Sequence, residues 1–129
     1  MLAVAASCLL FMSRPLSPAE MEARAGLARL LCRDGRHDDA LKIYTELMEE
    51  TRQAPFVRLG LAAAFFEKGN YAKAEEQYRI LLVGEPDSPV ALHDLAQTLL
   101  KQGRNLEAAE YLRRFNLQYS RLLSDGGNR

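Results

Sequence analysis

A repeat of 34 residues constrains the fold of this chain more than any other feature of its sequence. Gly35, Gly69 and Gly103 recur at this interval. Five further columns keep the same period with small, apolar or aromatic residues: Leu27, Leu61 and Leu95; Ala28, Ala62 and Ala96; Leu31, Phe65 and Leu99; Ala40, Ala74 and Ala108; Tyr44, Tyr78 and Leu112. Columns in register over three copies indicate three copies of one structural unit.

Each copy is predicted to form two helices around its glycine. Before the glycine, apolar residues such as Leu61 and Phe65 recur at helical spacing. The segment Ser17–Glu20 combines an N-cap serine, a first-turn proline and a capping-box glutamate. The glycine allows the left-handed conformation that ends the first helix. A second helix then follows, with Ala74 and Tyr78 on its apolar face in the middle copy.

These columns resemble the signature of the tetratricopeptide repeat family. The middle copy matches best, through Leu61, Ala62, Phe65, Gly69, Tyr71, Ala74, Tyr78 and Pro86. The resemblance covers about residues 20–122 and implies an all-α, right-handed solenoid of three helix-turn-helix repeats. We expect the repeats at about residues 18–54, 55–88 and 89–123, between an extra N-terminal helix within residues 1–17 and a polar tail at residues 124–129.

The chain departs from the family signature at several positions. The early tryptophan of each repeat is replaced by Arg24, Arg58 and Leu92. Arg52 stands where the first copy would carry its closing proline. We expect no extra capping helix after the third repeat, because only the polar residues 124–129 remain.

The N-terminal segment is an apolar run over residues 2–12. As a helix it would be about 16 Å long, shorter than the roughly 30 Å core of a bilayer. Three interpretations stay open: a cap packed on the first repeat, alone or shared with a partner; a truncated membrane anchor or signal; and a frayed tail. The location of the protein therefore stays open. It is cytoplasmic, or it is membrane-associated or periplasmic if the segment is a truncated signal or anchor, in which case this segment makes the contact with the membrane.

The charge balance and the cysteine count exclude several classes of partner. Lysines and arginines number 17, as do aspartates and glutamates, so the formal net charge is zero. A nucleic-acid binder normally carries a basic excess, and we expect no nucleic-acid partner. Two cysteines, Cys8 and Cys32, cannot build a disulfide framework, and with two histidines they argue against a Cys/His zinc site.

No catalytic motif is present in the sequence. His37 follows the first repeat's glycine closely and is interpreted as a packing or turn residue. Asp38 and Asp39 are interpreted as helix-start charges, and Cys32 as an inert, buried or half-buried thiol. We therefore expect no enzyme, no catalytic residue, no cofactor and no metal site.

In the resembled family, the first helices of the repeats line a concave groove. The face opposite the packing columns gives the candidate partner-binding residues Arg29, Arg33, Phe56, Leu59, Ala63, Phe66, His93, Gln97, Leu100 and Lys101. An apolar centre with basic flanks suits an extended or helical peptide that carries apolar anchors and some acidic residues. The alternative for the apolar side chains is packing between neighbouring repeats.

Two functions follow from this interpretation. The first is an adaptor or scaffold in a multiprotein assembly, which binds a peptide or partner protein in the groove. The alternative is a self-associating subunit, or an assembly subunit of a membrane complex, held through the apolar N-terminal helix and the uncapped ends. Binding of chaperone tails is not expected, because only Arg29 among the matching positions could hold a carboxylate.

Overall fold

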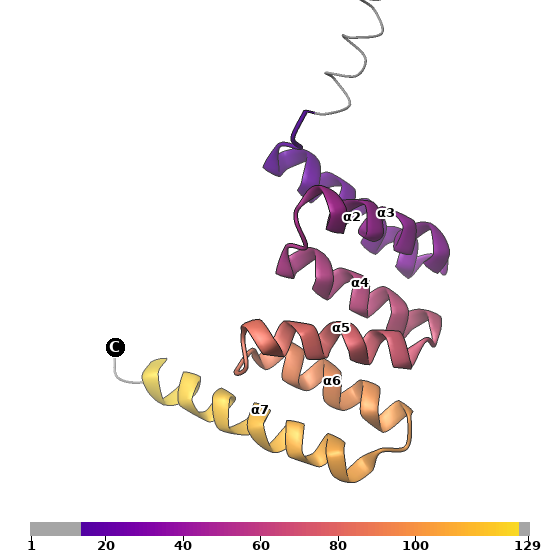
Figure 1. Cartoon of the computed structure of the whole chain (residues 1–129). Helices are drawn as coiled ribbons and strands as arrows, with labels where there is room; N and C mark the ends of the chain where they lie inside the picture. The colour runs from indigo at the N-terminus through magenta and orange to yellow at the C-terminus, as the bar shows by residue number, and fades with distance from the viewer. Residues whose placement is uncertain (1–13, 127–129) are drawn as a thin grey trace, which may run out of the picture.

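The computed structural model describes residues 14–126, and over this range it contains α-helices and no strand. The helices are α2 (Pro18–Arg33), α3 (His37–Glu50), α4 (Pro55–Lys68), α5 (Tyr71–Gly84), α6 (Pro89–Lys101) and α7 (Asn105–Gly126). They stack one after another in chain order (Figure 1). The predicted all-α helical-repeat solenoid is confirmed. The extra helix predicted within residues 1–17 lies outside the described residues, except for residues 14–17.

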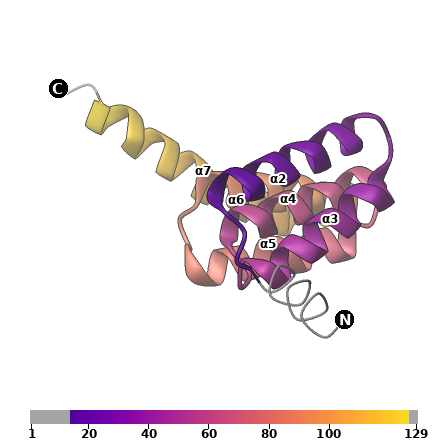
Figure 2. The ribbon, with the colours of Figure 1, turned by 90° about the horizontal axis from the view of Figure 1, so that it is seen from above.

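Contacts in the stack run mainly between consecutive helices, and α2 also touches α4. The pairs α2–α3, α4–α5 and α6–α7 form the three helix-turn-helix units. Helix α7 continues through residues 124–126, which the sequence analysis assigned to a polar tail. Its C-terminal half projects beyond the other helices (Figure 2). None of the helices from α2 to α7 is long and apolar enough to cross a membrane.

Local sequence signals set the helix boundaries. At α2 the predicted capping box forms: Ser17 Oγ accepts a hydrogen bond from the Glu20 amide at 3.2 Å, and Glu20 Oε2 accepts one from the Ser17 amide at 2.7 Å. The hydrogen bond from the Ser17 backbone and a second from Arg14 lower the pKa of Glu20 to about 2. The three repeat glycines have φ values of 75–89°, the left-handed region in which the first helices end.

The alanine columns lie in the buried core of the stack. All six of these alanines are completely buried: Ala28, Ala40, Ala62, Ala74, Ala96 and Ala108. Around them lie larger buried side chains, among them Leu47, Leu95 and Leu99. A methyl group at these points lets neighbouring backbones approach, while the leucines fill the remaining space. Packing at the small columns therefore sets the spacing between helices.

Polar contacts replace the family's tryptophan in two of the repeats. Arg58 is buried, and its guanidinium donates to Gln77 Oε1 at 2.6 Å and to Gln53 Oε1 at 2.7 Å. Arg24 in the first repeat donates to the Glu50 carboxylate at 2.9 Å. Each arginine thus joins the first helix of its repeat to the second.

An ion cluster joins the second repeat to the third. Arg79 of α5 pairs with Glu107 of α7 at 2.6 Å, and Arg104 pairs with Glu75 at 2.7 Å. Hydrogen bonds from Arg79 and Arg104 lower the pKa of Glu107. This cluster fixes the start of α7 against α5, so the longest helix is held at one end and projects at the other.

The Ala74 column provides a test of the packing register. Ala74→Leu adds three carbons to a site with no exposed surface, and we expect it to lower the free energy of unfolding by about 1–3 kcal/mol. Ala72→Leu, at an exposed position of the same helix, is the matched control and should change stability little. Urea unfolding curves of both variants measure the difference. Equal stability of the two variants would contradict the register.

Candidate partner-binding groove

Three hollows that share Ala63 lie along the first helices α2, α4 and α6. The largest, about 710 Å³, is lined by Pro18, Met21, Glu22, Ala25, Arg29, Tyr44, Phe56, Leu59, Gly60, Ala63 and Asp94. A second, about 490 Å³, is lined by Ala63, Phe66, Glu67, Tyr78, His93, Asp94 and Gln97. A third, about 330 Å³, is lined by Arg29, Cys32, Arg33, Tyr44, Gly60, Ala63, Ala64 and Glu67. Because Ala63 lines all three hollows, we treat them as sections of one groove.

Most of the candidate residues from the sequence lie in this groove. Eight of them line its hollows: Arg29, Arg33, Phe56, Leu59, Ala63, Phe66, His93 and Gln97. Leu100 and Lys101 lie exposed at the end of α6 and line none of the three hollows. Contact between any of these residues and a partner remains a prediction.

Two tyrosines from the second helices form the floor of the groove. The sequence analysis assigned Tyr44 and Tyr78 to packing columns, and both are almost fully buried, yet both also line hollows. The Tyr44 hydroxyl donates to the Ala25 carbonyl at 3.5 Å. Burial raises the pKa of Tyr44 to about 12 and raises that of Tyr78 as well. The floor is therefore neutral at physiological pH.

Tyr44 reaches the groove because Gly60 has no side chain. A Cβ at Gly60 would lie 2.5 Å from Tyr44 Cε1. The ring is buried between repeats and cannot move aside freely. No sequence column marks this contact, because Gly60 stands outside the repeat's glycine positions.

Charges of both signs line the groove. Arg29 and Arg33 make no ion pair or hydrogen bond among the residues that the structure describes. His93 Nδ1 lies 3.0 Å from Asp94 Oδ1. Carboxylates lie among the predicted basic residues: Glu22 and Asp94 line the largest hollow with Arg29, and Glu67 lines the third hollow with Arg29 and Arg33.

The residues that the sequence analysis considered for catalysis or metal binding lie near the turn between α2 and α3. Cys32 is buried, and burial together with the charge of Glu67 raises the pKa of its thiol, which favours the unreactive protonated form. Asp38 pairs with Lys68 at 2.5 Å. His37 begins α3, and its Nδ1 is buried without a hydrogen-bond partner among the described residues.

Two sequence models of the tetratricopeptide repeat match the chain, over residues 31–82 and 58–116. The chain belongs to the tetratricopeptide repeat (TPR) family. This agrees with the six-helix stack and with the repeat columns. No curated protein sequence matches this TPR chain at a significant level.

Solved structures with the same fold include complexes with peptides. The Yersinia enterocolitica type III secretion chaperone SycD, in complex with a peptide of the translocator YopD, is 25% identical, with a TM-score of 0.72 over 81% of this chain and 80% of that one. PcrH in complex with the chaperone binding region of PopB is 23% identical, with a TM-score of 0.75 over 83% and 86%. The first TPR of Spaghetti bound to an HSP90 peptide is 16% identical, with a TM-score of 0.71 over 81% and 82%. The TPR chain thus has the fold of a protein-interaction module.

Two glycine substitutions test the floor of the groove. Gly60→Ala should lower the free energy of unfolding by about 1–3 kcal/mol, because the new methyl group overlaps the Tyr44 ring. Gly26→Ala is the control: it lies within α2, and its Cβ would meet only Arg29 Nη2, at 3.9 Å. There we expect a gain of about 0.4–1 kcal/mol from the less flexible unfolded chain. Thermal or urea unfolding compares them, and a Gly60→Ala protein as stable as Gly26→Ala would contradict the contact.

Proposed function

We propose that this TPR protein binds an extended or helical segment of a partner protein in the groove, and so acts as an adaptor or scaffold in a multiprotein assembly. The observation that carries the proposal is the groove of adjoining hollows over α2, α4 and α6, with an apolar centre and two arginines, Arg29 and Arg33, that have no ion-pair partner among the described residues. Concave sites with apolar linings and a few convergent polar groups are typical of ligand binding.

The apolar centre supplies the affinity in this proposal. Phe56 is 54% exposed although it lies on the wall of the largest hollow, next to the half-buried Leu59. Covering apolar surface of this kind stabilises a complex by about 25 cal/mol per Å². Aromatic side chains at the centre of an interface often contribute most of the binding energy. A partner segment with apolar anchors fits this part of the groove.

The charges of the groove select for complementary charges on the segment. Arg29 and Arg33 would pair with carboxylates of the partner, since no described carboxylate holds them. Glu67 and Asp94, which line the same hollows as these arginines, favour basic or amide groups beside them. Complementary charges of this kind set the register and speed association more than they raise affinity. The expected segment therefore combines apolar anchors with acidic groups that meet Arg29 and Arg33.

The structural neighbours support binding of protein segments. SycD and PcrH are both solved with segments of other proteins, a peptide of YopD and the chaperone binding region of PopB. A chaperone tail of the HSP90 type is not proposed, since Arg29 alone matches the positions that would hold its carboxylate. No catalytic role is proposed for the groove: His93 contacts Asp94, and the lining of the second hollow includes no serine or cysteine.

Selection of peptides from a random library on the wild-type protein provides the probe. We expect the selected peptides to bind Phe56→Ala at least about tenfold more weakly, as truncation of a central aromatic anchor does. Leu106→Ala is the matched control, because Leu106 is 92% exposed and lines none of the three hollows. Fluorescence anisotropy measures the dissociation constants.

The same peptides test the basic end of the groove. Arg29→Glu with Arg33→Glu should weaken binding, and the loss should be larger at low salt. Lys42→Glu with Arg121→Glu changes charge by the same amount at exposed positions outside the hollows. Equal affinities of the groove variants and their controls would refute the groove as the binding site.

Self-association is a second candidate function, favoured by the projecting half of α7. This half exposes the large apolar side chains Leu117, Tyr119, Leu122 and Leu123, and exposed apolar patches often mark interaction sites. A contribution of the apolar N-terminal segment lies outside the described residues. If this function holds, sedimentation equilibrium should show a wild-type dimer that Leu122→Lys with Leu123→Lys dissociates. A wild-type monomer at high concentration would exclude it.

A further inference from the structure

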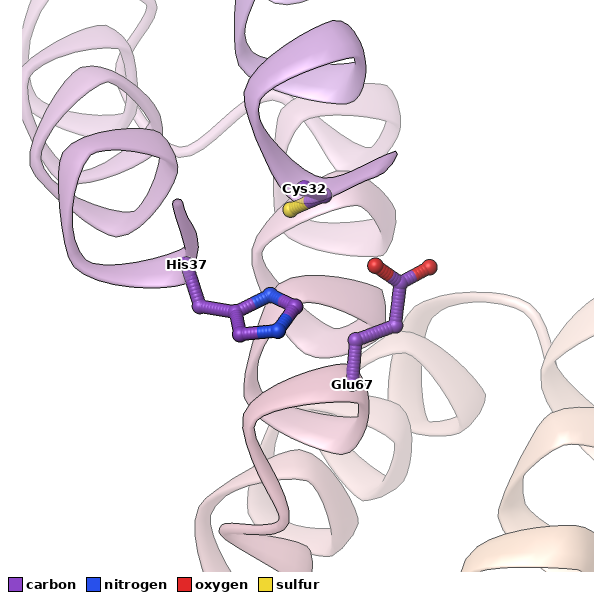
Figure 3. A group of neighbouring side chains, drawn as sticks. All are labelled: Cys32, His37 and Glu67. Atoms are coloured by element: carbon purple, nitrogen blue, oxygen red, sulfur yellow. The ribbon is translucent and has the colours of Figure 1, made fainter. Parts of the chain in front are cut away.

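Three side chains with metal-binding atoms meet where the first repeat packs on the second. They are Cys32 at the end of α2, His37 at the start of α3 and Glu67 at the end of α4. The cysteine sulfur, a ring nitrogen and a carboxylate oxygen all lie within 4.8 Å of one another. Figure 3 shows the imidazole of His37 turned towards both other side chains.

We propose that Cys32, His37 and Glu67 bind one transition-metal dication of the Zn²⁺ class. Thiolate, imidazole and carboxylate are the protein ligands of Zn²⁺. A set with one sulfur, one nitrogen and one oxygen suits Zn²⁺ and its neighbours, whereas Ca²⁺ and Mg²⁺ require oxygen ligands alone. The site shares Glu67 and the third hollow with the groove, but metal binding needs no bound peptide, so the two proposals are tested separately.

The state of His37 supports a ligand at this place. Its Nδ1 atom is buried without a hydrogen-bond partner among the residues that the structure describes. A buried polar atom without a partner is uncommon, because it has lost its water and gained nothing in return. The ring lies beside the buried sulfur of Cys32 and the carboxylate of Glu67. A cation between them would accept the nitrogen lone pair and offset the negative charges of the other two ligands.

The geometry needs a small adjustment to bind a metal. With bonds of about 2.0–2.3 Å, the ligand atoms of a tetrahedral zinc site lie roughly 3.3–3.7 Å apart. The turn at Gly35 places Cys32 and His37 close together, and the exposed side chain of Glu67 can close the remaining distance. Three protein ligands leave the fourth position to water or to a donor atom that enters the third hollow, which Cys32 and Glu67 line.

The sequence analysis expected no metal here because it counted cysteines and histidines alone. The third ligand is a carboxylate from the next repeat, 30 residues beyond His37. Neither its spacing nor its residue type distinguishes it from other surface glutamates. The stacking of α4 against the first repeat brings it to the other two ligands.

Titration of the tag-free full chain with Co²⁺, with Zn²⁺ as competitor, tests the site. We expect one bound equivalent, with a thiolate-to-cobalt charge-transfer band that Zn²⁺ removes. Cys32→Ser, His37→Ala and Glu67→Gln should each weaken binding at least about tenfold. The matched controls are the other thiol and the other histidine of the chain: Cys8→Ser and His93→Ala should keep both the band and the affinity.

Thermal unfolding gives a second readout that does not depend on the cobalt spectrum. Saturating Zn²⁺ should raise the melting temperature of the wild type and leave that of Glu67→Gln unchanged, because a ligand stabilises only the state it binds. Glu67 is exposed, so this variant folds even if the Cys32 variants do not. Absence of a charge-transfer band in the wild type overturns the proposal. So does equal binding by Glu67→Gln, or loss of the band in Cys8→Ser.

Discussion

The close approach of helices at the alanine columns is the contact on which the rest of the structure depends. Ala28, Ala74 and Ala96 are completely buried, and a side chain no larger than a methyl group lets neighbouring helices pack closely at these points. Because every helix packs mainly on the next one, each such contact fixes one step of the stack. The groove follows from these steps: the first helices lie at a spacing that leaves hollows, and the tyrosines of the second helices close the floor.

The fold was predictable from the sequence because its determinants are local and repeated. The columns at 34-residue intervals mark the small contacts, and Gly69 marks a left-handed turn that other residues adopt only with strain. The Ser17 capping box marks the start of α2 as the structure shows it. Most of the packing is between consecutive helices, so helices that are neighbours in the sequence are also neighbours in the stack. The repeat columns therefore predict which helices pack together. The end of α7 had no such signal, and it lies at Gly126, inside the predicted tail.

The groove was predictable only in part, because its details depend on pairs of residues from different helices. The helix face that carries Phe56 and Leu59 was identified from the resemblance to the family, whose first helices line the groove, together with the positions of the packing columns. The contact of Tyr44 with Gly60 was not predicted. Tyr44 belongs to a repeat column, but Gly60 lies within a helix at a position that no repeat column marks. Asp94 is a further example: it was not among the predicted groove residues, and the structure places it in the lining of two hollows.

The most direct test of the account is a map of the binding surface by NMR. Backbone amide shifts of the labelled protein are measured with and without a peptide selected on the wild type. The account predicts that shift changes concentrate in α2, α4 and α6, around Arg29, Leu59 and His93, and that the projecting half of α7 stays unchanged. Changes concentrated in α7, with the first helices unaffected, would contradict a groove-binding module and favour an interface at the end of the stack.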